Sequence, residues 1–190
     1  VPIATAPALV AVGMSLWTRS APSAREIYST QLSKPAEEFI LQDGSKVVLN
    51  TDSEVRVEFT PTHREVKLVR GEALFQVAHN AERPFDVVAG NAIVRAVGTA
   101  FSVRVRDRSY VDVMVTEGRV ALNPPSSAML VAGQAATLIG SRVQTWQVEG
   151  GEIERKLQWI DGQIAFTGEA LSEAVTEFNR YNRTRIVIVD

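Results

Sequence analysis

Apolar and polar side chains alternate along most of the stretch from Phe39 to Gln147. Valine and phenylalanine fill the apolar positions and charged residues fill many of the others, as in Phe101-Ser102-Val103-Arg104-Val105. A period of two is typical of antiparallel strands that bury one face and expose the other. Turn residues interrupt the pattern at short intervals, which indicates roughly ten to twelve strands of about four to six residues. The central region is therefore predicted to be all-β.

A strand–glycine–strand unit recurs along the chain. Its copies are residues 66–75, 113–122 and 157–166, with a looser relative at 39–48. Glycine supplies the positive φ that a tight hairpin or a bulge requires. The spacing between copies is irregular, so two interpretations stay open. The unit is either the ordinary turn of a hairpin-rich protein or the element of an irregular stack of hairpins, a solenoid-like fold or a twisted sandwich.

The hydrophobic pattern changes towards the C-terminus. Leu157 to Phe166 alternates like a hairpin, and Ile186 to Val189 is a short β-branched run typical of a strand. Between them, apolar residues recur at helical spacing from about Glu169 to Tyr181. Residues 151–190 are therefore predicted to form a small βαβ unit. Because so small a unit is not stable alone, we expect it to dock on the β region or to continue into further structure.

The first residues are apolar. Val1 to Thr18 carry no charge, and Arg19 is the first charged side chain. An apolar helix over these residues would span about 27 Å, which approaches the roughly 30 Å hydrocarbon core of a bilayer. Trp17 followed by Arg19 is typical of the point where a helix leaves the membrane. We expect residues 1–18 to be the end of a transmembrane helix; a secretory signal remnant and an apolar segment packed on a soluble core are the alternatives. Residues 19–37 are predicted to be a linker followed by a strand that leads into the fold.

Charge and composition exclude several classes of function. The 190 residues carry 20 basic and 22 acidic side chains, whereas nucleic-acid-binding proteins have a clustered positive excess. The absence of cysteine excludes disulfide scaffolds, zinc ribbons and thiol catalysis. The two histidines, His63 and His79, lack the His-x-His and carboxylate pattern of a metal site, and no hydrolase or phosphate-loop motif occurs. We therefore expect no nucleic acid partner, no metal, no cofactor and no turnover enzyme.

One peptide bond and one strand carry candidate chemistry. Gly98-Thr99 lies between two predicted strands. A strained bond there would let the threonine hydroxyl attack the preceding carbonyl and form an ester that water cleaves; the alternative is an ordinary hairpin turn.

Arg104, Arg106 and Arg108 alternate along one face of a strand. That face is either exposed to solvent or a docking patch for an acidic partner.

Six stretches between residues 38 and 140 occur in an order that is similar to a known family. They are Leu41–Asn50, Arg70–Ala78, Arg83–Val87, Ala96–Val103, Val115–Val120 and Ala132–Ala135. Together they resemble the periplasmic region of the FecR family, the single-pass anti-sigma regulators of bacterial iron uptake. Trp159 to Tyr181 resembles the segment that follows this region in proteobacterial members, a small βαβ domain of the secretin/TonB short N-terminal type. The resemblance implies a FecR-like all-β domain at residues 38–150 and a partial βαβ signalling or docking domain at 151–190.

The resemblance implies a role in cell-surface signalling. The chain would be the periplasmic sensor of an inner-membrane, single-pass anti-sigma factor, with the residues after about 19 in the periplasm. Its partners would be the periplasmic signalling domain of an outer-membrane TonB-dependent siderophore receptor and, through a cytoplasmic segment absent from this chain, an extracytoplasmic-function sigma factor. Regulatory proteases would then free the sigma factor. Some members break themselves at a Gly-Thr bond in the motif matched by Gly98-Thr99, which implies single-turnover self-cleavage there.

The candidate docking element is the predicted βαβ unit, because a small open sheet has strand edges that can pair with a partner. The candidate contact residues, each with a core role as its alternative, are Trp159, Phe166, Ile186, Val187, Ile188 and Val189. A competing function is a structural or carbohydrate-binding β-module of the cell envelope. Such a module would need a row of exposed aromatic side chains, and the three tryptophans and three tyrosines of this chain are widely spaced.

Overall fold

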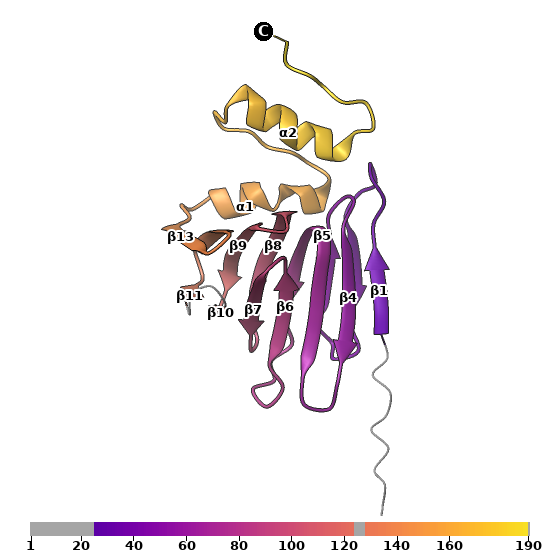
Figure 1. The fold of residues 1–190 in the computed structure, drawn as a ribbon, viewed down its shortest axis with the longest axis vertical. Helices are drawn as coiled ribbons and strands as arrows, with labels where there is room; N and C mark the ends of the chain where they lie inside the picture. Colours follow the sequence, from indigo (N-terminus) through magenta and orange to yellow (C-terminus); the bar gives the residue numbers. More distant parts are fainter. Residues whose placement is uncertain (1–24, 124–127, 190) are drawn as a thin grey trace, which may run out of the picture.

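Thirteen strands, two α-helices and one 3-10 helix make up residues 25–123 and 128–189, the part of the chain that this computed structural model describes (Figure 1). The strands are β1 (Arg25–Ser29), β2 (Glu37–Ile40), β3 (Lys46–Leu49), β4 (Glu54–Phe59), β5 (Arg64–Gln76), β6 (Phe85–Ala89), β7 (Ala92–Ala96), β8 (Ala100–Asp107), β9 (Tyr110–Glu117), β10 (Arg119–Asn123), β11 (Ala128–Val131), β12 (Gln134–Ile139) and β13 (Arg142–Gln147). The mainly β class predicted from the alternating pattern is confirmed. The transmembrane helix expected at 1–18 lies outside the described residues, and within them no helix is long and apolar enough to cross a membrane.

The strands form one curled sheet whose two layers share the long strand β5 (Figure 1). Residues 64–70 of β5 pair with β4 and β6, and residues 71–76 pair with β3 and β8. Layer one is therefore β1-β4-β5-β6-β7-β10-β11, and layer two is β2-β3-β5-β8-β9-β12-β13. The pair β5–β6 is parallel, and the other strand pairs of the described residues are antiparallel. The strands thus form a curled mixed sheet in the shape of a half-barrel.

The repeated glycine marks points where the chain changes layer. Gly71 lies in the middle of β5 with φ +85°, and Gly118 lies between β9 of layer two and β10 of layer one with φ +74°. A Cβ on Gly71 would stand 2.1 Å from Ser53 Oγ, so only glycine fits this crossing. The positive φ expected at these glycines is confirmed; Gly71 and Gly118 form no tight hairpin, whereas Gly44 of the looser copy lies between the antiparallel pair β2 and β3. The third copy of the unit, residues 157–166, forms no strand.

Alternate side chains of both layers fill the space between them. Phe75, Phe85 and Phe101 are fully buried there; the rings of Phe75 and Phe101 stack at 5.4 Å, and Phe85 meets Phe75 edge-on at 6.2 Å. Burial of each phenylalanine ring stabilises the folded state by about 1.5–3 kcal/mol. The alternation of apolar and polar residues is thus explained by a core shared between two half-buried layers.

A buried cation lies at the start of β5, which the sequence pattern did not indicate. Arg64 is 1% exposed, and its Nη1 lies 2.6 Å from Asp43 Oδ2. Its guanidinium also donates to the carbonyl oxygens of Ala78, Asn80 and Arg83, at 3.0, 3.4 and 2.8 Å. A buried charge needs a charged partner and hydrogen bonds, and Arg64 has both Asp43 and four hydrogen bonds. It therefore fixes the loop that follows β5.

The C-terminal helices cover the outer face of layer two. They are α1 (Glu152–Lys156), the 3-10 helix η1 (Gln158–Asp161) and α2 (Leu171–Tyr181), which lies beyond the other two in Figure 1. The covered face presents one row of neighbouring side chains across the strands: Val48, Leu74, Ser102, Met114 and Ala135. Ile153 and Leu157 pack over Met114 and Ala135, and Trp159 packs over Val48 and Leu74.

The predicted βαβ unit is only partly present. Its helix is confirmed as α2, but Leu157–Phe166 contains η1 in place of a hairpin, and Ile186–Val189 forms no strand. A strand requires a neighbour to satisfy its backbone groups, and no described strand pairs with either segment. The backbone of Ile186 bonds instead to the Asn179 side chain, which accepts its N–H at 2.8 Å and donates to its carbonyl oxygen at 2.9 Å.

Candidate functional site

The Gly98-Thr99 bond lies where the chain crosses from β7 in layer one to β8 in layer two. β7 pairs with β6 and β10, and β8 pairs with β5 and β9, so the two strands that flank the bond do not form a hairpin with each other. The hairpin alternative is therefore wrong. Gly98 has φ +138°, and a Cβ on it would stand 2.6 Å from His79 Nδ1. The crossing thus combines a backbone conformation unfavourable for L side chains with a contact that leaves no room for one.

Thr99 places its hydroxyl inside the protein without a partner. The residue is 7% exposed, and Oγ1 is buried with no hydrogen bond to any residue of the described ranges. The carbonyl oxygen of Thr99 accepts the Val77 N–H at 2.9 Å, which fixes the backbone beside it. An unpaired buried hydroxyl costs about 1–3 kcal/mol, so the fold spends stability at this position.

Gly118 packs against the Gly98-Thr99 bond. A Cβ there would stand 2.8 Å from Thr99 Cγ2 and 3.3 Å from the carbonyl oxygen of Gly98. Three crossing segments, around His79, Gly98 and Gly118, therefore surround one peptide bond. The sequence pointed to the bond but not to these neighbours, because they come together only when the layers are formed.

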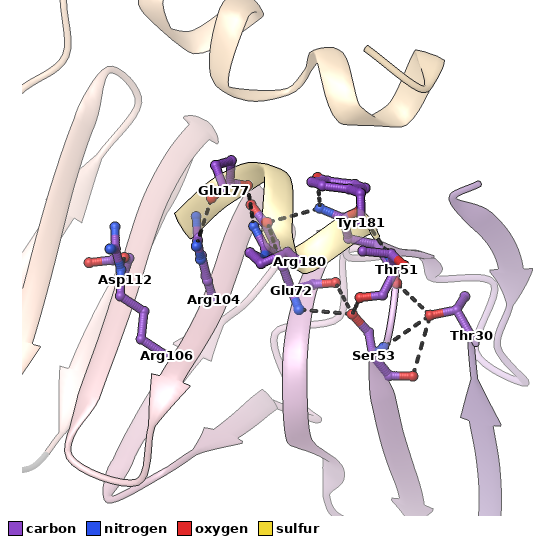
Figure 2. Close-up of polar contacts among 11 residues, drawn as sticks. Thr30, Thr51, Ser53, Glu72, Arg104, Arg106, Asp112, Glu177, Arg180 and Tyr181 are labelled. Atoms are coloured by element: carbon purple, nitrogen blue, oxygen red, sulfur yellow. Dashed lines mark hydrogen bonds and ion pairs between the residues drawn. The ribbon is translucent and has the colours of Figure 1, made fainter. Parts of the chain in front are cut away.

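Helix α2 is held on layer two by charged and polar contacts (Figure 2). Arg180 Nη2 lies 2.9 Å from Glu72 Oε2, and Arg104 Nη2 lies 2.8 Å from Glu177 Oε2. Asn50 Nδ2 donates to the Tyr181 hydroxyl oxygen at 2.8 Å. Glu72, Arg104 and Asp112 are register neighbours on β5, β8 and β9, so a row of polar side chains on the sheet receives the helix. The sequence singled out Arg104 but not Glu72, Asp112 or the helix that this row receives.

Burial and charge shift the pKa values at this contact. Burial raises the pKa of Tyr181 above its ordinary value, and the hydrogen bond from Asn50 opposes that shift only in part. Burial alone would lower the pKa of Arg180, but Glu72 and Glu177 outweigh it and the net shift is upward. Tyr181 is therefore neutral and Arg180 charged at neutral pH, so Arg180 can pair with both Glu72 and Glu177.

A pocket of about 490 Å³ lies between layer two and the helical segment. Arg104, Arg106 and Asp112 line its floor, and Trp159 and Phe166 line its helical side. Arg106 Nε lies 2.6 Å from Asp112 Oδ2. Arg104 and Arg106 of β8 therefore both form ion pairs within the chain. The acidic partner of Arg104 is Glu177 of the protein's own helix α2.

The predicted contact residues occupy three different environments. Trp159 is 6% exposed and belongs to the packing between η1 and layer two, which favours its core role. Phe166 is half-buried with its ring 5.4 Å from that of Phe178. Ile186, Val187, Ile188 and Val189 are 51, 75, 46 and 86% exposed. Only the last four, here called the apolar tail, present a free surface.

In the described ranges, no three His, Asp or Glu side chains gather in the way that a metal site would require.

The FecR protein family model matches residues 27–121, which is half of the chain. The chain belongs to the FecR family. Two crystal structures of a proposed anti-sigma factor from Parabacteroides distasonis share its fold, both with a TM-score of 0.72 and 23% identity. The matches cover 83% and 82% of this chain and 75% and 74% of the other. No curated protein matches this FecR-family chain in sequence.

Proposed function

We propose that this FecR-family chain is the periplasmic sensor of a single-pass anti-sigma factor. Family membership over half of the chain is the observation that carries the proposal. The fold shared with a proposed anti-sigma factor adds to it. Together they support an anti-sigma-factor-like regulator. Its residues 1–18 would end a helix in the inner membrane, and a cytoplasmic segment outside this chain would hold the sigma factor.

The input would be the periplasmic signalling domain of a TonB-dependent siderophore receptor. The apolar tail supports this part of the proposal, because Val187 and Val189 are 75 and 86% exposed and β-branched. An extended β-branched segment can gain a strand partner from another protein and bury its side chains at the same time. The tail is thus suited to pairing with the edge of a receptor domain.

Calorimetry tests the receptor partner. The natural periplasmic region from residue 20 onward is titrated with the signalling domain of each siderophore receptor in the same genome. Micromolar or tighter binding to one receptor is expected, with Val187→Asp at least tenfold weaker. Met129→Asp is the matched control, because Met129 is 60% exposed on β11, in the other layer. A folded protein that binds no receptor domain would contradict the proposal and favour an envelope module.

We also propose that the chain cleaves itself once, at Gly98-Thr99. Thr99 Oγ1 would add to the Gly98 carbonyl carbon, the C–N bond would break, and the Thr99 nitrogen would take up a proton as the ester forms. Water would then split the ester into the Gly98 carboxylate and the Thr99 hydroxyl. The buried, unpaired hydroxyl supports this step, since no hydrogen bond of the described structure has to be broken before attack. Regulatory proteases would act on the product.

Fragment analysis tests self-cleavage. Newly synthesised chain should yield fragments of 98 and 92 residues, and hydroxylamine should speed their appearance by attacking the ester. Thr99→Val keeps the shape and removes the hydroxyl, so this variant should stay whole and be at least as stable as the wild type. Thr99→Ser should still cleave. A wild-type band that stays whole for days would refute the step.

A further inference from the structure

An acyl shift at Gly98-Thr99 needs a group that moves a proton. The hydroxyl loses a proton as it attacks, and the departing nitrogen gains one. A side chain that accepts and returns this proton typically contributes about 10²–10⁴-fold to such a step. Carboxylates, imidazoles and amines at the bond are therefore the groups to consider.

His79 is a titratable side chain that the structure places against Gly98, on the carbonyl side of this bond. Its Nδ1 stands 2.6 Å, and its Cβ 2.9 Å, from the position that a Cβ on Gly98 would occupy. The imidazole therefore packs on the Gly98 Cα, which is two bonds from the Thr99 nitrogen. The contact explains why residue 98 is glycine, since any larger residue would displace the ring.

The segment that carries His79 is fixed from several sides. Arg64 donates to the carbonyl oxygens of Ala78 and Asn80, the residues on either side of His79, at 3.0 and 3.4 Å. Ala78 N–H donates to Ser45 Oγ at 3.0 Å, and Val77 N–H donates to the carbonyl oxygen of Thr99. Arg64 and its partner Asp43 are the charged groups fixed at this segment. These contacts hold the backbone of His79 beside the bond at which the proton moves.

We infer that His79 is the proton-transfer residue for cleavage at Gly98-Thr99. The neutral imidazole takes the proton from Thr99 Oγ1 as the oxygen bonds to the Gly98 carbonyl carbon, and returns it to the Thr99 nitrogen as the C–N bond breaks. The ring ends the step in its starting form, so no further reactant is consumed. This inference rests on the proposed self-cleavage and adds to it the group that drives the step.

The test follows the rate of fragment formation from pH 5 to pH 8 in cell-free synthesis of the whole chain. A protonated imidazole cannot accept the hydroxyl proton, so the wild-type rate should fall as the pH is lowered. His79→Gln should be slower by about 10²-fold or more at pH 7.5 and lose the pH dependence. His79→Ala should regain part of the rate when imidazole is added. His63→Gln, which removes the other histidine of the chain, should keep both the rate and the pH profile.

The outcomes separate the two ideas. If the wild type cleaves and His79→Gln keeps its rate and pH profile, His79 has no such role and self-cleavage stands. If the wild type stays whole, as Thr99→Val does, both ideas fail. Adding His79→Gln to the Thr99→Val chain, which does not cleave, shows whether the histidine variant folds. If it does not, rescue of His79→Ala by imidazole decides, because a structural loss would not respond to imidazole.

Discussion

Gly71→Ala is expected to destabilise the fold far more than the same change at Gly44, a glycine with nearly the same φ. Gly71 has φ +85° and lies where β5 passes between the layers. An added Cβ would stand 2.1 Å from Ser53 Oγ and 2.7 Å from Ser53 Cα. Ser53 is fully buried, and its Oγ accepts the Glu72 N–H at 2.9 Å, so it has little freedom to move aside.

The magnitude follows from two contributions. A left-handed conformation costs alanine about 1–2 kcal/mol, and overpacking costs about 1–3 kcal/mol, so Gly71→Ala should lower the free energy of unfolding by about 2–5 kcal/mol. Gly44 has φ +82°, and an added Cβ there would meet nothing within 4 Å. Gly44→Ala should therefore lose only about 1–2 kcal/mol. Urea unfolding, followed by tryptophan fluorescence to which the buried Trp159 contributes, measures both variants.

Equal losses in the two alanine variants would refute the reasoning, because the overlap with Ser53 would then contribute nothing. A further variant sharpens the test. Ser53→Ala removes the oxygen at 2.1 Å but leaves Ser53 Cα and Cβ, both at 2.7 Å. Combined with Gly71→Ala, it should recover only part of the lost stability.

Three further predictions concern charged groups. Arg64→Met leaves the buried Asp43 without its cation and should lower the free energy of unfolding by about 3–5 kcal/mol in urea titrations, with partial recovery when Asp43→Asn is added. The hydrogen bond to Glu26 raises the pKa of Tyr28 from 10.0 to about 12. Because the Tyr28 phenol ionises more easily in the unfolded chain, the free energy of unfolding should fall as the pH rises from about 10 to about 12. Glu26→Gln should move one phenolate absorbance transition down towards 10.0. Arg180→Ala removes charge-assisted contacts worth about 1.5–3 kcal/mol and should speed hydrogen exchange in α2 at least tenfold while leaving β5 protected.

The sheet was predictable because its physical cause is local. A strand with one face on a core shows alternation in its own sequence, as Val111, Val113 and Val115 do: all three are buried in β9. What alternation does not show is which partner covers the second face. Glu72 looks like a solvent-facing position, and the alternation of Arg104 fits either solvent or an acidic partner, yet the two residues pair with Arg180 and Glu177 of α2.

The C-terminal strands were mispredicted because a strand depends on a neighbour that lies elsewhere in the chain. Ile186–Val189 has the composition of a strand but pairs with no strand of the described residues. Leu157–Phe166 alternates, yet its Trp159 packs on the apolar row of layer two from a 3-10 helix. At the candidate site the sequence showed the bond at Gly98 but gave His79 no part in it, since only the layer crossings bring the two together.

The position of Gly98-Thr99 at a layer crossing determines what cleavage there can do. β7 ends before the bond and pairs with two strands, β6 from the first fragment and β10 from the second. β8 begins after the bond and lies between β5, from the first fragment, and β9, from the second. The two fragments therefore share both layers and the core between them, and hydrolysis alone leaves them joined by strand pairing. Cleavage would then remove only the covalent connection, so that a force or a protease acting on one fragment could separate what an intact chain would hold together.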